Sequence, residues 1–229
     1  RDLHRVDRRQ RQMCIRDRAS LYEKKGLFGK AKILYERSLA IEEKAFGSDH
    51  PNIAIPLNNL AGLYVREGLN SKREPLFKRS LSIEEKALGS NHPNIAISLN
   101  NLAELYRRQG LFQKAIPLYK RSLAIYEKAF RSDHPDIAMS LNNLALTFSY
   151  QGFFSKAEPL FQRALVIKEK ALGLKHPSIA KTLNNLALAY DLQGFFSKSE
   201  PLYQRALSIL SLIHISEPTR RYAISYAVF

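Results

Sequence analysis

The sequence predicts an all-α fold, a right-handed α-solenoid of stacked antiparallel helix pairs. The first observation is a five-residue string, Leu-Asn-Asn-Leu-Ala, that recurs every 42 positions. A fixed period of this length is typical of solenoids made of one repeated unit. The second observation is that a glycine and a His-Pro pair also recur every 42 positions. The positions are Leu57, Leu99, Leu141 and Leu183 for the string, Gly26, Gly68, Gly110, Gly152 and Gly194 for the glycine, and His50, His92, His134 and His176 for the histidine.

Each unit contains the apolar pattern of two amphipathic helices. In the first, apolar residues fall at i, i+3, i+4 and i+7, which makes one stripe along an α-helix. They are Leu99, Leu102, Ala103 and Tyr106 in the unit that follows Pro93. A second helix begins near Phe112 and turns Ala115, Leu118, Tyr119, Leu123 and Ile125 inward. Gln109-Gly110 and residues 131–135 contain turn residues that end the two helices, so the unit is a helical hairpin.

These residues carry a resemblance to a known family. A small residue follows each leucine of the string, an aromatic residue stands three positions further on, and the second helix has its own small and aromatic positions. They are Ala61, Ala103, Ala145 and Ala187; Tyr64, Tyr106, Phe148 and Tyr190; Ala115 with Tyr119; and Ala157 with Phe161. The units resemble the tetratricopeptide repeat (TPR), whose arrays form a superhelix. The period, the Asn-Asn pair, the Glu-Pro-Leu run and the His-Pro link resemble its kinesin light chain type.

The two ends of the chain have no counterpart in the repeat. Residues 13–17 can be written ATG TGT ATA AGA GAC, and residues 210–215 as CTG TCT CTT ATA CAC ATC; the two strings are reverse complements where they overlap. They and their flanks resemble translated sequencing-library adapter. We therefore interpret residues 1–18 and 210–229 as non-native segments and exclude them from reasoning about the fold.

Composition changes once those segments are set apart. Lys and Arg fall from 36 to 27 and Asp and Glu from 21 to 17, so the formal charge falls from +15 to +10. The single cysteine, Cys14, is also lost, which leaves no disulfide, thiolate nucleophile or cysteine metal site. The sequence has no signal peptide and no apolar run long enough to span a bilayer. We expect a soluble cytoplasmic protein.

The repeat pattern divides residues 19–209 into units. We expect a partial repeat at 19–51, repeats at 52–93, 94–135 and 136–177, and a truncated repeat at 178–209. The repeat at 52–93 is the least regular, because Arg73 replaces the small alanine, Asn70 replaces the turn aromatic and Pro56 lies near a helix start. Because proline lacks a backbone donor, we expect looser packing there. Incomplete end repeats leave apolar faces uncovered, and we expect the chain to associate.

A second stripe of the first helix is the candidate binding face. Around the helix axis, at roughly 100° per residue, this stripe lies about 130° from the core stripe. In the repeat at 52–93 it consists of Ile55, Asn58, Gly62 and Val65. This stripe and its equivalents would line a concave peptide-binding groove. The candidate groove residues are Asn58, Asn100, Asn142, Asn184, Glu104, Arg107, Arg108, Leu146, Tyr150, Lys181 and Leu188.

The first asparagine of each pair has two readings. An Asn side chain offers both a donor and an acceptor, which suits an extended peptide backbone. An asparagine repeated in register can equally bridge neighbouring helices. For the second asparagine of each pair, at Asn59, Asn101, Asn143 and Asn185, we expect a structural role.

The resemblance also implies a class of function. The kinesin light chain type of repeat holds short cargo peptides, often with acidic residues near a tryptophan, so it implies a scaffold for adaptor or cargo recognition. The basic residues Arg66, Arg107, Arg108 and Lys181 would suit acidic flanks. The alternative is a C-terminal sensor or regulatory domain of a larger signalling protein of the NTPase type. An upstream P-loop would favour that alternative, and an upstream coiled coil would favour the adaptor.

Other functions are disfavoured. Histidines one repeat apart cannot reach one metal ion, because packed helices lie about 8 to 10 Å apart and a ligand lies about 2 Å from its metal; we expect turn residues. We expect the Glu-Glu-Lys runs at residues 42–44 and 84–86 to lie on solvated faces of second helices. We find no phosphate loop, catalytic triad or carboxylate pair. We expect no enzyme, cofactor, metal, small-molecule substrate or membrane partner, and no nucleic acid, because the basic residues interleave with glutamates.

Overall fold

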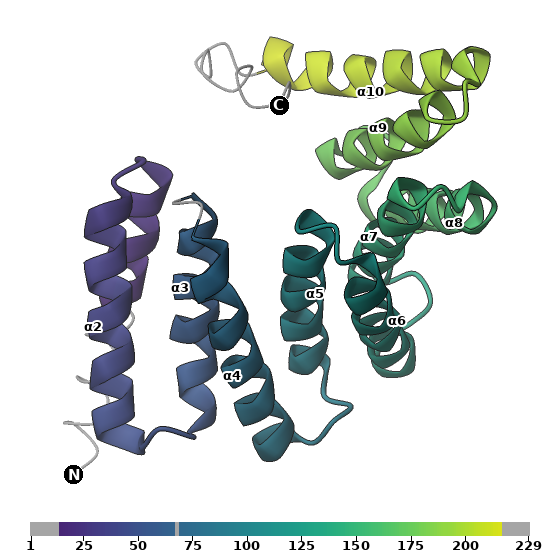
Figure 1. The fold of residues 1–229 in the computed structure, drawn as a ribbon. Coiled ribbons are helices and arrows are strands. Elements are labelled where there is room, and N and C mark those ends of the chain that lie inside the picture. Colours follow the sequence, from purple (N-terminus) through teal and green to yellow (C-terminus); the bar gives the residue numbers. More distant parts are fainter. Residues whose placement is uncertain (1–13, 67–68, 217–229) are drawn as a thin grey trace. The chain divides into compact units, whose positions relative to one another are not determined.

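The computed structural model describes residues 14–66 and 69–216, and every regular element in these two ranges is helical. A first helix covers residues 14–24. It is followed by α2 (Phe28–Phe46), the 3₁₀ helix η1 (Pro51–Ile53), α3 (Ala54–Arg66), α4 (Asn70–Leu88), α5 (Pro93–Arg108), α6 (Phe112–Ala129), α7 (Pro135–Tyr150), α8 (Phe154–Leu172), α9 (Pro177–Asp191) and α10 (Phe196–Ser216). Figure 1 shows these helices as successive antiparallel pairs, which confirms the all-α fold and the helical hairpin.

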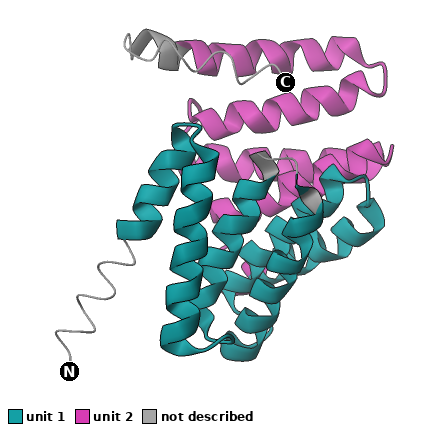
Figure 2. Cartoon of the chain, turned by 60° about the vertical axis from the view of Figure 1, so that its left-hand side comes forward, with its two compact units in different colours: residues 1–125 teal, residues 126–229 magenta. Residues whose placement is uncertain are grey.

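The chain forms two compact units, residues 1–125 and residues 126–229 (Figure 2). The boundary falls inside α6. In the first unit α3 packs against α2 and α4, and α4 packs against α5; in the second, α8 packs against α7 and α9, and α9 against α10. Neighbours in sequence are therefore neighbours in space, as expected of a repeat array. In the described residues, no helix has the length and apolar character needed to cross a membrane.

The histidine of each His-Pro pair caps the first helix of a repeat. At α5, the Nδ1 atom of His92 accepts a hydrogen bond from the backbone N–H of Asn94 over 3.2 Å, and Pro93 occupies the first helical position. This position suits proline, because its missing N–H would have no partner inside the helix. The same bond recurs at His50, His134 and His176. The predicted turn histidines are thus helix N-caps.

Pro56 changes how one of these helices begins. In α5, α7 and α9 the α-helix starts at the proline of the His-Pro pair, whereas after His50 the chain first forms η1 and the α-helix begins at Ala54. Proline at position 56 cannot donate to the carbonyl of Asn52 four residues earlier, and its ring crowds that carbonyl. The first turn therefore tightens to the 3₁₀ form.

The turn inside each hairpin needs glycine. Gly110 has a φ of 73°, and its N–H bonds the carbonyl of Arg107 while the next N–H, of Leu111, bonds the carbonyl of Tyr106 over 2.8 Å. These two bonds form a Schellman motif, in which glycine adopts the left-handed conformation at least cost. Gly152 closes the next hairpin in the same way.

The predicted core stripe is buried. Leu99 and Ala103 have no exposed surface, and Leu102 and Tyr106 are almost fully buried. In the first unit, Ala31 and Tyr35 of α2 share an apolar cluster with Leu60 and Tyr64 of α3. In the second unit, residues of α9 and α10 form another cluster, made of Ile179, Ala180, Leu183, Ala206 and Ile209. Each fully buried leucine stabilises the fold by about 1.5 to 3 kcal/mol.

The expectation that the Glu-Glu-Lys runs are solvated is wrong for their first glutamates. Glu42 and Glu84 are 2% and 8% exposed, and burial raises the pKa of both carboxyl groups. The second glutamate recurs in every repeat, also where the first is replaced, and it pairs with an arginine of the next second helix. Glu43 pairs with Arg79, Glu85 with Arg121, Glu127 with Arg163 and Glu169 with Arg205. The period-42 register thus creates one ion pair per junction, each worth about 0 to 1 kcal/mol because the partners are part-exposed.

Candidate functional site

The first helices of the first unit present one shared face to solvent. We define the first-helix face by residues at i, i+3 or i+4, and i+7 spacing, which lie on one side of a helix. Its members are Ile55, Asn58 and Gly62 on α3 and Ile97, Asn101, Glu104 and Arg108 on α5. Ile55 is 52% exposed and Ile97 49% exposed. The face therefore combines exposed apolar side chains with amides and charges.

A cavity of about 200 Å³ lies on this face, between α3, α4 and α5. It contains part of the predicted groove, since Asn58, Glu104 and Arg108 line it. It also contains residues of α4. The complete lining is Asn58, Gly62, Arg73, Phe77, Asn101, Glu104 and Arg108. We call this space the Arg73 cavity.

Glu104 is the electrostatic centre of the cavity wall. Its carboxylate accepts hydrogen bonds from Arg107 at 2.7 and 2.8 Å, from the Nε of Arg108 at 2.7 Å and from the Tyr119 hydroxyl at 3.0 Å. Burial alone would raise the pKa of this carboxyl, but the bonds and charges of the two arginines and the bond from Tyr119 lower it to about 2. The carboxylate is therefore fixed in its charged form.

Arg73 is a buried cation in the same wall. Its side chain is 3% exposed, its Nε donates to the carbonyl oxygen of Ala61 over 3.1 Å, and its guanidinium lies 5.7 Å from the centre of the Phe77 ring. Burial lowers the pKa of the guanidinium, and repulsion by Arg108 adds to the effect while Glu104 opposes it. Arginine stays charged under these conditions, so the cavity wall has an excess of positive charge.

The first asparagines of the first unit bond to neighbouring helices. The Nδ2 of Asn58 donates to the Ser98 hydroxyl over 3.2 Å, which joins α3 to α5. The Nδ2 of Asn100 donates to the Ser122 hydroxyl over 2.7 Å, and this hydroxyl donates to the carbonyl of Ala96. Asn100 is 5% exposed. Of the adjacent asparagines of α5, Asn101 lines the cavity, whereas Asn100 bridges α5 to α6.

The second unit carries the equivalent positions on α7 and α9. Asn142 is buried, and its Oδ1 accepts a hydrogen bond from the Nδ2 of Asn185 over 3.1 Å. Asn184 and Lys181 are exposed on α9, and Leu188 is half-buried. On α7, Leu146 is half-buried, while Met139 and Tyr150 are exposed. This face is more apolar than its counterpart in the first unit.

Sequence reasoning did not select three residues of the cavity, Arg73, Phe77 and Asn101, as site residues. Arg73 was visible as a departure from the repeat, because Ala31, Ala115 and Ala157 occupy the same position. Phe77 occupies the aromatic position that recurs in the second helix of each repeat, so it gives no separate signal. Asn101 was assigned a structural role, because a helical wheel places the second asparagine of each pair about 70° from the centre of the predicted groove.

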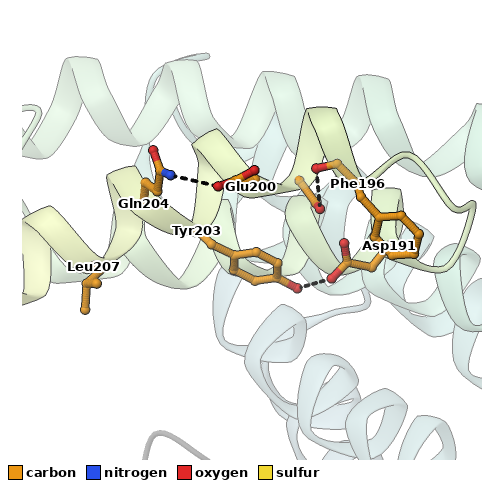
Figure 3. A pocket seen from close by; sticks show the side chains of 7 residues that line it. Asp191, Phe196, Glu200, Tyr203, Gln204 and Leu207 are labelled. Carbon is orange, nitrogen blue, oxygen red and sulfur yellow. Dashed lines mark hydrogen bonds between the residues drawn. The ribbon is translucent and has the colours of Figure 1, made fainter.

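A larger cavity of about 530 Å³ lies on the second unit, along α10. Figure 3 shows Phe196, Tyr203 and Leu207 on this surface, with the Tyr203 hydroxyl donating to Asp191 over 2.8 Å. Tyr203 is 37% exposed, whereas Phe161, at the same position of the preceding repeat, has no exposed surface. α8 packs against α9, and among the described residues no following helix covers α10 in this way. We therefore assign this cavity to an exposed side of α10.

The tandem hairpins with their capped first helices define a helical-repeat protein with a candidate binding face on its first helices. The sequence matches the tetratricopeptide repeat family over residues 11–72, 74–128, 106–170 and 136–211. The chain belongs to this family. The matched range includes a few residues of each terminal segment, 1–18 and 210–229. Our interpretation of these segments as translated adapter stays a prediction.

Solved structures agree with this assignment. The kinesin light chain-like TPR repeats of Podosopora anserina, known from a crystal structure, are 28% identical, with a TM-score of 0.73, and the alignment covers 89% of this chain and 96% of that one. BtubC (BKLC) from P. vanneervenii is 26% identical, with a TM-score of 0.73 and coverage of 86% and 78%. A Rap protein complexed with Competence and Sporulation Factor shares the fold at 16% identity, with a TM-score of 0.71 and coverage of 86% and 53%. A search of curated proteins finds no match.

Proposed function

We propose that this chain is a non-catalytic scaffold that binds an extended peptide or a segment of a partner protein on the first-helix faces of its repeats. The observation that carries the proposal is the exposure of Ile55 and Ile97 on the helices whose other residues line the Arg73 cavity. Exposed apolar side chains beside amides and charges are typical of a surface that a partner covers. Kinesin light chain-like repeats are among the similar structures, which supports an adaptor or cargo-recognition role.

Each class of side chain has a part in this binding. Ile55 and Ile97 would anchor apolar residues of the ligand. Asn101 and, in the second unit, Asn184 would bond its backbone, because an amide side chain both donates and accepts. In the second unit, Leu146, Leu188 and Tyr150 would add apolar contact, and Lys181 would favour acidic residues. We retain Asn58, Asn100 and Asn142 as residues that hold the binding helices in register.

The expected affinity is modest. Each hydrogen bond contributes about 1 kcal/mol net, and ordering a flexible peptide costs several times that amount. Apolar anchoring is therefore required, and a dissociation constant near the micromolar range, about −8 kcal/mol, is expected.

A second candidate function is ligand sensing within a larger regulatory protein. The observation that favours it is the structural likeness to a Rap protein solved with Competence and Sporulation Factor. In that case the same face would bind an effector and pass the signal to another domain. The two candidates share the binding surface and differ in the ligand.

The experiment is a fluorescence anisotropy titration of the full chain with labelled peptides that contain an aromatic residue flanked by Asp or Glu. Ile97→Asp introduces a charge on the first-helix face, and we expect at least about a tenfold loss of affinity. Val166→Asp is the matched control, because Val166 is 62% exposed on the second helix α8. Equal affinity of the Ile97→Asp variant and the parent would contradict the proposed face.

A further inference from the structure

A position of each second helix corresponds, in the repeat register, to a position 14 residues later on the next first helix. At the junction of α8 and α9, the Nζ of Lys168 donates to the Thr182 hydroxyl across this spacing. At the junction of α4 and α5, the Ser98 hydroxyl bonds the carboxyl group of Glu84. The four pairs are Glu42 with Pro56, Glu84 with Ser98, Tyr126 with Ser140, and Lys168 with Thr182. Glu84 and Ser98 thus combine a carboxyl group with a facing hydroxyl.

Glu84 is buried beside apolar side chains. It is 8% exposed, and its neighbour Ile83 shares a buried cluster with Ile53 of η1 and Leu57 of α3. One carboxyl oxygen, Oε2, is buried and has no hydrogen-bond partner among the residues that the structure describes. A buried carboxylate with an unused acceptor is costly, and a neutral carboxyl group is less so. The site therefore favours the protonated form.

The charges near Glu84 are few. From α5, His92 acts on the carboxyl group, whereas η1 and α3 contribute the apolar cluster. On its own helix, the adjacent Glu85 is paired with Arg121 of α6. Burial raises the pKa of Glu84 above the value of 4.5 for an exposed glutamate, and the bond from Ser98 and the charge of His92 oppose the effect. Glu84 thus binds a proton at a higher pH than an exposed glutamate does.

Ser98 also connects Glu84 to the first-helix face. Its hydroxyl oxygen accepts a hydrogen bond from the Nδ2 of Asn58 over 3.2 Å, and Asn58 lines the Arg73 cavity. The Oδ1 of Asn58 is a second buried acceptor for which the described residues supply no donor. A carboxylate can only accept hydrogen bonds, so with Glu84 charged, Asn58 donates to Ser98 and Ser98 donates to Glu84.

We propose that Glu84, Ser98 and Asn58 form a proton-linked relay that sets which group Asn58 presents to the ligand. When Glu84 takes one proton from solvent, its O–H donates to the Ser98 oxygen and the Ser98 O–H turns to Asn58. The Asn58 amide then rotates so that its Oδ1 accepts this bond. Asn58 thereby offers a donor where it offered an acceptor, and the bridge between α3 and α5 is kept. This inference rests on the proposed peptide-binding function and adds its regulation by acid.

The first experiment follows the relay without a ligand. The full chain would be titrated from about pH 8 to about pH 5, with the Glu84 carboxyl carbon and the Asn58 Nδ2 protons followed by NMR. We expect one shared midpoint above pH 4.5. Glu84→Gln and Ser98→Ala should each abolish the Asn58 transition, while Glu84 still titrates in the Ser98→Ala variant. Asn58 signals that ignore the Glu84 titration, or that still titrate in the Glu84→Gln variant, would overturn the proposal.

Two control variants separate Glu84 from other titrating groups. Glu42 is 2% exposed, and burial raises its pKa too, but its repeat register pairs it with Pro56, which has no hydroxyl. Glu42→Gln should therefore leave the Asn58 transition unchanged. His92→Asn removes an imidazole that can titrate in this range and keeps a side chain that caps helices. The transition should persist in this variant as well, and its loss in either control would contradict the relay.

The second experiment measures the effect on binding. The anisotropy titration with the aromatic, acidic peptide would be repeated at about pH 7.5 and about pH 5.5, where the peptide carboxyl groups stay charged. We expect the affinities to differ at least about threefold in the parent and to be equal in the Glu84→Gln variant. Equal affinities in the parent would refute regulation by the relay alone. An Asn58 transition without peptide binding at either pH would refute the proposed function alone.

Discussion

The ammonium group of Lys168 donates a hydrogen bond to the Thr182 hydroxyl over 2.8 Å and another to the carbonyl of Ser178 over 3.1 Å. Lys168 lies on α8, and both partners lie on α9, so a buried cation joins a second helix to the next first helix. The same position of earlier repeats holds Glu42, Glu84 and Tyr126. The junction position thus accepts side chains of either charge.

Lys168 gives a pH-dependent prediction. Burial lowers the pKa of its ammonium group to about 8, and repulsion by Lys181 adds to the effect. The unfolded chain, with a pKa near 10.5, binds the proton more tightly between those values, so stability should rise as pH increases from about 8 to 10.5. Lys168→Met should be more stable than the parent by about 1 to 3 kcal/mol at pH 7.

Urea unfolding at neutral and high pH measures this difference, which should shrink as the pH approaches 10.5. Lys170→Met is the control, because Lys170 lies on the same helix with 70% of its side chain exposed. Its effect should stay within about 0.5 kcal/mol. A gap between the Lys168→Met variant and the parent that does not change with pH would refute the explanation by burial.

Glu104 predicts a rise of stability with pH in the acidic range. Its pKa is held at about 2, below the value near 4.5 of the unfolded chain. The stabilisation is therefore fully present above pH 4.5 and is lost as the pH falls toward 2. The contribution is at most about 3 kcal/mol. Glu104→Gln should unfold with a weaker pH dependence in this range, and an unchanged dependence would show that Arg107 and Arg108 do not stabilise the charged form.

Ala145 tests the core assignment. Its side chain has no exposed surface at the contact between the helices of one hairpin. Ala145→Leu should overfill this contact and destabilise the protein by about 1 to 3 kcal/mol. Ala124→Leu, on an exposed position of α6, is the matched control. Melting followed by circular dichroism measures both, and equal melting temperatures of the Ala145→Leu variant and the parent would mean that the helices pack elsewhere.

The hairpins could be predicted from the sequence because helix formation and pairing depend on local pattern. Three features act within one repeat: the period of 42 residues, the apolar stripe that contains Leu99 and Tyr106, and the turn glycine at position 110. Repetition made the pattern visible several times, so one irregular helix start at Pro56 did not obscure it. The core residues followed directly from the helical period.

The junction and the cavity could not be predicted in the same way, because they depend on which side of a helix the next repeat covers. Glu42, Glu84 and Lys168 belong to charge-rich runs whose burial is decided by the facing helix. Arg73 stood out as a substitution, but its environment is formed by Gly62 and Glu104, which lie 11 and 31 positions away in the chain. Which of Asn100 and Asn101 lines the cavity depends on the rotation of α5 about its own axis. The packing of the neighbouring helices sets this rotation.

The central claim is that the first-helix faces bind the ligand, and photo-crosslinking tests it most directly. An acidic peptide with benzophenone in place of its aromatic residue would be irradiated with the full chain, and the attachment sites would be identified by mass spectrometry. The account predicts crosslinks at residues 55–62 and 97–108, or at the equivalent positions of α7 and α9, with competition by unlabelled peptide. Competed crosslinks confined to the exposed surfaces of the second helices, such as Val166, would contradict it.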